Sequence, residues 1–367
     1  MVDTLTSDWI TTGPKTRRFE EKAAEYLGVT HTLALNSCTA ALHLSLAAAD
    51  IGEGDEVITS PLTFCATANV VLHQRARVVF VDVERDTFNL DPEALRSAIT
   101  EKTKAVIPVH YAGQPCEMDE ILSVAREHGL RVFEDAAHAI GATYRGRRAG
   151  TMGDTGCYSF YAIKNMTTGE GGLLATNDDE IAERARILSL HGISKDAWKR
   201  YSSQGSWFYE VTLPGFKYNM SDLQASLGLH QLAKLDGFIE RREQLARRYD
   251  RAFEEMEEIE IQRVRPERRH ARHLYPVLID LERLSIDRAQ FIEALRAENI
   301  GSTVNFIPVH LHPYYRRTFG YQEGDYPVAE EIYRREISLP LFPRMKDSDV
   351  DSVVSAVRKI IARYNSS

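Results

Sequence analysis

Lys164 is the residue of this chain whose setting most clearly suggests chemistry. It lies between two short apolar runs, 158–161 and 173–176, which are typical of β-strands, and the residues between them are small and polar, with several glycines. A loop lysine is usually a solvated charge. Glycines, however, let the backbone crowd a ligand, and a lysine enclosed in such a bend can have a pKa low enough to make it a nucleophile. The pattern therefore predicts a lysine that forms a Schiff base.

A carboxylate that could serve the same site follows the run 130–134, whose sequence LRVFE is typical of a short buried strand. Asp135 stands at the carboxyl end of this run, where ligands collect in open α/β sheets. An aspartate there can keep a pyridine nitrogen protonated, because opposite charges at short range favour the charged form of both groups. Asp135 could equally be a helix cap, and the residues alone leave that alternative open.

A candidate anion site lies at Asn36-Ser37-Cys38-Thr39, directly before an alanine- and leucine-rich helix predicted over 40–49. Asn36 or Ser37 is expected to cap this helix, and its first N–H groups, together with the positive end of the helix dipole, favour a phosphate. Every capped helix offers this much, so the motif gains weight only beside a reactive lysine and a carboxylate. The three features together are what a pyridoxal cofactor needs.

Six segments, in order, resemble the DegT/DnrJ/EryC1/StrS family of pyridoxal 5'-phosphate (PLP)-dependent nucleotide-sugar aminotransferases. The segments are TGPKTRRFEE (12–21), NSCTAALHLSL (36–46), SPLTFCATAN (60–69), VFEDAAHAIGA (132–142), GDTGCYSFYAIKNMTTGEGG (153–172) and PGFKYNMSDLQASLGLHQL (214–232). The match covers nearly the whole chain. It implies an α/β protein of PLP-dependent transferase fold type I, with a mostly parallel, doubly wound sheet in a large domain and a small α+β domain at the C-terminus.

The resemblance also implies roles for individual residues around the cofactor. Lys164 would form the Schiff base with the cofactor aldehyde, and Asp135 would pair with the pyridine nitrogen. Phe64 would lie against the face of the ring. His138 matches a family position close to the phenolic oxygen of the cofactor.

The phosphate of the cofactor is implied to be held by Cys38 and Thr39 at the helix start, with Ser159. In the family an asparagine of the neighbouring subunit usually completes this site, so the resemblance implies a homodimer with shared active sites. Many members read GYNYRM where this chain reads GFKYNM at 215–220. Asn219 is the preferred candidate for the shared contact, and Lys217 is the second.

Composition and charge argue against several other classes of protein. A chain of 367 residues with 43% hydrophobic and 27% charged residues is ordinary for a soluble globular protein of two domains, expected at 1–244 and 245–367. A net charge of −8 argues against nucleic acid as the main partner. The four cysteines form no C-x-x-C pair, which disfavours disulfides and zinc. With neither an apolar run of spanning length nor a signal pattern, the protein is expected in the cytoplasm and not at a membrane.

Apolar runs that alternate with helical segments predict the sheet that positions these residues. Parallel strands are expected at 32–35, 56–59, 77–83, 105–109 and 131–134, with helices between them. Long helices are expected over 221–256 with a break at Gly237. In the C-terminal part, strands are expected at 274–279, 303–307 and 337–339, and helices from 287, over 327–336 and over 349–364. The stretch 191–211 has no clear period, and such a long irregular stretch is usually functional or disordered. The family resemblance implies that it lines the substrate site or the subunit interface.

Histidines at 110, 310 and 312 allow more than one role. His110 follows the strand expected at 105–109 and fits a core or a site equally well. His310 and His312 suggest a metal, but no carboxylate or cysteine lies near them in the sequence, so no metal site is expected. Because His310 falls in a segment that resembles the sugar-facing segment of the family, it is a candidate substrate contact.

The predicted function is a two-step transamination. By resemblance, L-glutamate gives its amino group and leaves the cofactor as pyridoxamine phosphate (PMP). A keto-sugar on UDP, dTDP or GDP, preferably a 4-keto-6-deoxy sugar, then takes the amine and becomes an amino sugar for surface-polysaccharide or glycoconjugate biosynthesis. Freed Lys164 would act as general base and acid. The alternatives are a PLP-dependent sugar dehydratase, in which histidine replaces the lysine, and a non-catalytic regulatory or binding member of the fold.

Overall fold

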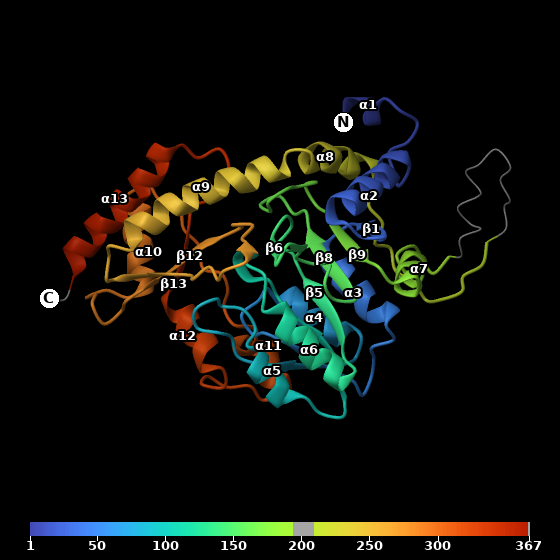
Figure 1. Ribbon diagram of the computed structural model, residues 1–367, viewed down its shortest axis with the longest axis horizontal. Helices are drawn as coiled ribbons and strands as arrows, with labels where there is room; N and C mark the ends of the chain where they lie inside the picture. The colour runs from blue at the N-terminus through green and yellow to red at the C-terminus, as the bar shows by residue number, and fades with distance from the viewer. Residues whose placement is uncertain (194–208, 366–367) are drawn as a thin grey trace.

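A seven-stranded sheet organises the computed structural model, which describes residues 1–193 and 209–365 (Figure 1). Its strand order is β1-β9-β8-β5-β4-β2-β3. The strands are β1 (His31–Leu35), β2 (Glu56–Thr59), β3 (Arg77–Phe80), β4 (Thr103–Ile107), β5 (Arg131–Asp135), β8 (Thr155–Ser159) and β9 (Gly172–Thr176). Strand β9 runs antiparallel to both of its neighbours, and the remaining pairs are parallel. The expected α/β class with a mostly parallel sheet is confirmed.

Helices cover both faces of this sheet, because alternate strand residues point to opposite sides. In β4, Ala105 and Ile107 pack with one core cluster and Val106 with another. The first cluster lies under α3 (Cys38–Ala48), α4 (Cys65–His73) and α7 (Asp179–Leu188). The opposite face is covered by α2 (Pro14–Leu27), α5 (Pro92–Ala98) and α6 (Met118–His128). All residues of β8 and β9 are buried, as expected for strands with helices on both sides.

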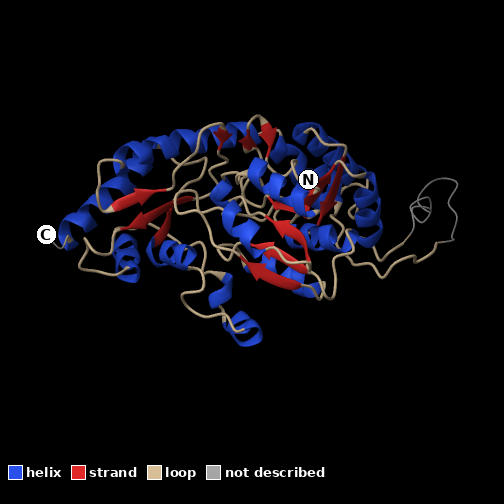
Figure 2. Ribbon diagram, turned by 60° about the horizontal axis from the view of Figure 1, so that its bottom comes forward, coloured by secondary structure: helices blue, strands red, loops and turns tan. Residues whose placement is uncertain are grey.

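A second, antiparallel sheet lies in the C-terminal part, and Figure 2 shows it as a separate group of strands. It consists of β10 (Ile259–Ile261), β12 (Tyr275–Ile279) and β13 (Glu336–Leu339). Its core contains residues from 245 onwards, including those of α10 (Arg288–Ala297) and α13 (Asp347–Tyr364). A small third sheet joins β6 (Thr143–Tyr144), β7 (Arg147–Arg148) and β11 (Arg268–Arg269).

One long helix, α9 (Leu235–Phe253), links the two larger sheets along one edge of the molecule (Figure 1). Leu235 and Ile239 pack into the core of the large sheet. Leu245 and Phe253 pack into the core of the C-terminal sheet. The boundary expected at 244/245 therefore falls inside a continuous helix, and the division into 1–244 and 245–367 stays a prediction.

A buried carboxylate ties β5 to the chain that leads into β8. Glu134 accepts hydrogen bonds from the backbone N–H groups of Gly150 (2.7 Å), Met152 (2.6 Å) and Gly153 (2.7 Å). Its Oε2 also lies 2.8 Å from Nε2 of His110, and both side chains are fully buried. His110 is therefore a core residue, which answers the question its sequence position left open. These bonds hold 150–153 beside β5, so that β8 enters the sheet as its neighbour.

Several elements differ from expectation. Residues 303–307 form no strand, because the N–H of Asn305 donates to the buried carboxylate of Glu336 (2.8 Å) and only Thr303 bridges Ser338. Two short helices not expected from the sequence follow, η3 (Val309–Leu311) and α11 (Pro313–Phe319), before α12 (Pro327–Arg335). The helical break lies between α8 (Asp222–Leu232) and α9, so Gly237 is inside the first turn of α9.

Part of the irregular stretch 191–211, with Trp198, Trp207 and Phe208, lies outside the described residues. The short helix α1 (Val2–Leu5) precedes α2 at the N-terminus. Within 1–193 and 209–365, no helix combines the length and the apolar character needed to cross a lipid bilayer.

Removal of the Glu134 carboxylate should destabilise the protein. In Glu134→Ala, three backbone N–H groups and the buried His110 lose their acceptor, so we expect the free energy of unfolding to fall by roughly 3–5 kcal/mol. Urea unfolding followed by circular dichroism measures this. Glu257→Ala, which removes an exposed partner of Arg283, is the matched control and should leave the midpoint unchanged. Equal midpoints for the two variants would contradict the anchoring role.

Candidate active site

Lys164 lies in the turn between β8 and β9, beyond the carboxyl end of β8. The turn is closed by backbone hydrogen bonds from Phe160 to Gly171 (2.9 Å) and from Thr168 to Phe160 (2.9 Å). The side chain is partly buried, and burial lowers its pKa from 10.5 to about 8, while the nearby Cys38 and Asp135 oppose that shift. A substantial fraction of Lys164 is therefore a neutral, nucleophilic amine near pH 8.

Asp135 ends β5, the strand next to β8, so its carboxylate shares a sheet edge with the lysine turn. Thr67 donates to its Oδ2 (2.8 Å) and the N–H of Ala137 donates to its Oδ1 (3.1 Å). Because the Thr67 proton is used in this way, Thr67 accepts from Thr63 (2.8 Å). Burial raises the pKa of Asp135, while these hydrogen bonds and Lys164 lower it. The helix-cap alternative lacks support, since in the described chain β6 and not a helix follows β5.

The start of α3 lies beside this pair and has the features that can hold an anion. Ser37 caps the helix by accepting from the N–H of Ala40 (3.1 Å). The N–H groups of Cys38 and Thr39, the first two helical residues, have no acceptor within the helix. Gly172 of β9 packs directly against this turn, since a Cβ on Gly172 would lie 2.2 Å from the carbonyl carbon of Ser37. Only glycine lets the strand and the helix start approach so closely.

Ser159 lies near this helix start, on the sheet. It is the last residue of β8 and pairs with Gly172 in the β8–β9 ladder. Burial raises the pKa of the Cys38 thiol well above its usual value of 9.0, Asp135 raises it further, and Lys164 lowers it. Cys38 is thus a neutral thiol within electrostatic range of both charged groups of the site. The structure places Lys164, Asp135, Cys38 and Ser159 at one edge of the sheet, and their roles toward a cofactor stay predictions.

Two buried histidines lie beside the lysine. The rings of His138 and His273 are 4.3 Å apart, and His138 also stacks on Phe306 at 5.8 Å. Nδ1 of His138 has no hydrogen-bond partner among the described residues. His273, whose Nε2 lies 3.5 Å from Nζ of Lys164, was not identified from the sequence. Its position directly before an apolar strand was the only available signal, and that signal is common in protein cores.

Phe64 and His310 have opposite exposures. Phe64 precedes α4 and is 59% exposed, with its ring 6.0 Å from that of Phe306. An exposed aromatic ring of this kind is available to cover a planar ligand. His310 is fully buried, its Nε2 lies 2.9 Å from Oε1 of Glu330, and its ring packs on Tyr326. A histidine enclosed in this way does not face a sugar, so the structure argues against direct substrate contact by His310.

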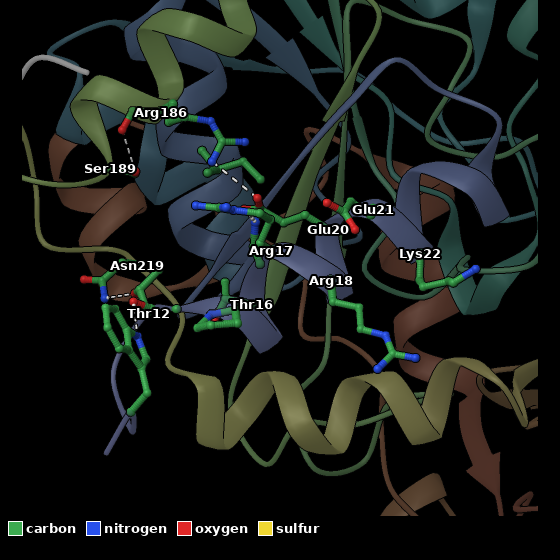
Figure 3. Close-up of a pocket in the computed structure, with 15 residues that line it drawn as sticks. Thr12, Thr16, Arg17, Arg18, Glu20, Glu21, Lys22, Arg186, Ser189 and Asn219 are labelled. Carbon is green, nitrogen blue, oxygen red and sulfur yellow. Dashed lines mark hydrogen bonds and ion pairs between the residues drawn. The ribbon is translucent and has the colours of Figure 1, made fainter. Parts of the chain in front are cut away.

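Asn219 lines a cavity that is separate from the Lys164 group, and Figure 3 shows this cavity at the start of α2. The cavity has a volume of about 710 Å³ and is lined by residues that include Arg17, Glu20 and Arg186, and none of the Lys164 group lines it. Nδ2 of Asn219 donates to Oγ1 of Thr12 (2.6 Å), and Lys217 contacts the Asn219 side-chain oxygen. The side chains of Asn219 and Lys217 are therefore in contact in this structure. Their contact with the phosphate of a second subunit stays a prediction.

The residues around Lys164 fit pyridoxal phosphate. The free N–H groups of α3 suit a phosphate, and the carboxylate of Asp135 suits a protonated ring nitrogen. The buried Nδ1 of His138 has no partner within 1–193 and 209–365, which is costly unless a ligand supplies one. Within the described ranges, no group of three or more His, Cys, Asp or Glu side chains is arranged to hold a metal ion.

Comparison with known proteins gives consistent matches over the whole chain. The model of the DegT/DnrJ/EryC1/StrS aminotransferase family matches residues 1–358. The spore coat polysaccharide biosynthesis protein SpsC of Bacillus subtilis is 54% identical over 362 residues, which cover 98% of this chain and 93% of SpsC.

Solved structures match equally well. Spr1654 of Streptococcus pneumoniae, described as a sugar aminotransferase, matches in its PLP form with a TM-score of 0.91 and 35% identity, over 99% of this chain and 95% of that one. Its PMP form gives a TM-score of 0.92 at 36% identity and the same coverage. Helicobacter pylori PseC, an aminotransferase involved in pseudoaminic acid biosynthesis, matches with a TM-score of 0.91 and 31% identity over 99% of this chain and 95% of PseC.

The lowered pKa of Lys164 gives a test that needs no cofactor. In cofactor-free protein, modification of Lys164 by trinitrobenzenesulfonate should rise with pH through a midpoint of about 8, because only the neutral amine reacts. Mass spectrometry of the peptide that contains Lys164 follows the reaction, and Lys164→Ala identifies its signal. A midpoint near the ordinary lysine value of about 10.4 would contradict the burial argument.

Proposed function

Because the chain belongs to the DegT/DnrJ/EryC1/StrS aminotransferase family, we propose that it moves the amino group of L-glutamate to a keto-sugar carried on a nucleotide diphosphate. The protein is a PLP-dependent sugar aminotransferase, and the proposal adds the donor and the acceptor. The acceptor is a 4-keto-6-deoxy sugar on UDP, dTDP or GDP. The product is an amino sugar for surface-polysaccharide or glycoconjugate biosynthesis. The relatives SpsC and PseC, named for a spore coat polysaccharide and for pseudoaminic acid, support this sugar class.

The observation that carries the proposal is the pairing of Lys164 with Asp135 at neighbouring strand ends. The amine has a pKa of about 8, close to a physiological working pH, where a general base is most effective. The carboxylate is held by two hydrogen bonds that favour its charged form. Lysine at 164 also disfavours the dehydratase alternative, in which the family replaces it with histidine.

The mechanism assigns a separate task to each group. Bound pyridoxal phosphate supplies an aldehyde that exchanges amines and a ring that withdraws electrons from the reacting carbon. Asp135 holds the proton on the ring nitrogen, because Thr67 and Ala137 fix the direction of its carboxylate. Nζ of Lys164 takes the proton from the α-carbon of the amino donor. It delivers this proton to the cofactor carbon that keeps the transferred nitrogen. The same atom moves the proton in the opposite sense for the sugar.

Binding tasks fall to the residues around this pair. The N–H groups of Cys38 and Thr39 and the hydroxyl of Ser159 hold the phosphate, in keeping with the positive end of α3. Phe64 covers one face of the ring, and Nδ1 of His138 finds its missing partner on the phenolic oxygen. Since the net charge of the protein is −8, an anionic nucleotide must be bound by local groups and not by the overall field.

The proposal includes a homodimer in the cytoplasm. Ile163, next to the lysine, is 64% exposed and Tyr161 is 45% exposed. Apolar side chains at the rim of a site are expected to be covered, and a second subunit would cover them. That subunit would bring Asn219, or Lys217 beside it, to the phosphate. The large and small domains would meet inside α9.

Replacement of Lys164 should abolish turnover. In Lys164→Arg the general base is lost although a cation remains, so we expect a decrease in kcat of about 10³-fold or more. A panel of keto-sugar nucleotides with L-glutamate, assayed for 2-oxoglutarate release, measures the rate and also identifies the acceptor. Borohydride reduction of the wild-type protein should attach the cofactor to Lys164. Activity retained by the purified variant would sink the proposal.

Asp135 should affect rate more than cofactor binding. Asp135→Asn should keep the cofactor but lose most of the rate with glutamate, because a neutral amide does not hold a proton on the ring nitrogen. Thr67→Val, which removes one hydrogen bond from the carboxylate, should slow the reaction by a smaller factor, on the order of tenfold. The absorbance change on mixing with glutamate gives both rates. Full activity in Asp135→Asn would show that another group serves the ring.

A further inference from the structure

His273 is a buried side chain in contact with the reactive lysine, and none of the roles above uses it. It is 5% exposed, and its Nε2 lies 3.5 Å from Nζ of Lys164. The two residues are 109 positions apart in the sequence, so the contact exists only in the folded protein. A distance of this size is at the long end for a hydrogen bond, as is common before a ligand tightens an active site.

The hydrogen bonds around His273 determine which ring nitrogen carries the proton. The amide Nδ2 of Asn165 donates to the backbone carbonyl of Ala271 (2.7 Å), which fixes the orientation of the amide. Its Oδ1 therefore faces Nδ1 of His273 (3.1 Å). An amide oxygen only accepts, so Nδ1 of His273 must be protonated. The lone pair of Nε2 is left free and faces Lys164.

The ring is also held neutral and in place. Burial keeps the pKa of His273 well below 6.5, and the neighbouring His138, Lys164, Arg242 and His270 lower it further. Arg242 donates to the carbonyl oxygen of His273 (3.3 Å) and of Leu341 (2.6 Å), which anchors the backbone. The acceptor nitrogen thus has a fixed position and a fixed protonation state.

We propose that His273 is the positioning residue that accepts a hydrogen bond from Lys164 and holds its free amine between the two half-reactions. The inference rests on the proposed function, because a transamination releases the lysine and needs its free amine in both half-reactions. A neutral amine has two N–H donors and one lone pair. Donation of one N–H to Nε2 stops rotation about the terminal bond and directs the lone pair away from His273, toward the reacting carbon. The second N–H remains free.

Two substitutions separate this role from a structural one. In His273→Asn the shorter amide keeps the place of Nδ1 and the bond to Asn165, but it does not reach Lys164. In His273→Gln the amide oxygen takes the place of Nε2 and keeps an acceptor for the lysine. Both side chains are polar and smaller than or similar to histidine, so both variants should fold, and thermal unfolding checks this.

The readout is the pH midpoint for trinitrobenzenesulfonate modification of Lys164 in cofactor-free protein. An acceptor stabilises the charged ammonium, so its loss in His273→Asn should lower the midpoint by about one pH unit, while His273→Gln should restore it. With cofactor, His273→Asn should lower kcat with little change in KM for glutamate. An unchanged midpoint in His273→Asn, or equal midpoints in the two variants, would overturn the proposal. The midpoint is measured without cofactor or substrate. It therefore tests the role of His273 even if the proposed reaction is wrong.

Discussion

The arrangement of the active site depends on one buried carboxylate that makes no contact with the reacting groups. Glu134 accepts hydrogen bonds from the N–H groups of Gly150, Met152 and Gly153 at the end of β5, and His110 contacts Oε2 of the same carboxylate. Because that segment leads into β8, its position decides that β8 pairs in parallel with β5 and sets Asp135 opposite Cys157. The acid and the lysine turn then share one edge of the sheet. Hydrogen bonds in the core thus set the register of β5 and β8, and this register sets how far Asp135 lies from the lysine turn.

Burial is the second constraint, and it acts on the two catalytic groups in opposite ways. Loss of water raises the pKa of Asp135 and lowers that of Lys164, so desolvation alone would neutralise both. For the lysine this is useful, because the amine must be neutral to react. For the aspartate it is harmful, and the donors from Thr67 and Ala137 offset it by favouring the carboxylate. At both groups burial has the larger effect on the pKa, and it is partly offset by Cys38 and Asp135 at the lysine and by Thr67, Ala137 and Lys164 at the aspartate.

Much of this could be predicted from local sequence patterns. Strand β2 has the bounds expected at 56–59, and α10 begins after Asp287, where a helix was expected, with a capping box of Asp287 and Gln290. Lys164 and Asp135 were predicted because strand ends and glycine turns are visible locally. The strand expected at 303–307 fails because the partner of Asn305 is Glu336, a carboxylate about thirty positions away.

The role of histidines was the least predictable part of the site. His310 was a candidate for substrate contact because of its segment, but its ring is enclosed by Glu330 and Tyr326. No local pattern marks His273, although it lies next to the lysine, because the contact forms only when the chain returns past the sheet. A histidine in the core and a histidine in an active site have similar neighbours in the sequence. Only tertiary contacts separate the two.

The continuity of α9 has a consequence for how this enzyme selects its substrates. The helix spans about 28 Å and is anchored in one core at its start and in another at its end. A hinge between the two layers would have to bend the helix or pull one end out of its core. A large rotation of one sheet toward the other is therefore disfavoured, and the shape of the substrate site is set before a sugar binds. Specificity should then change through side chains at the rim, one substitution at a time.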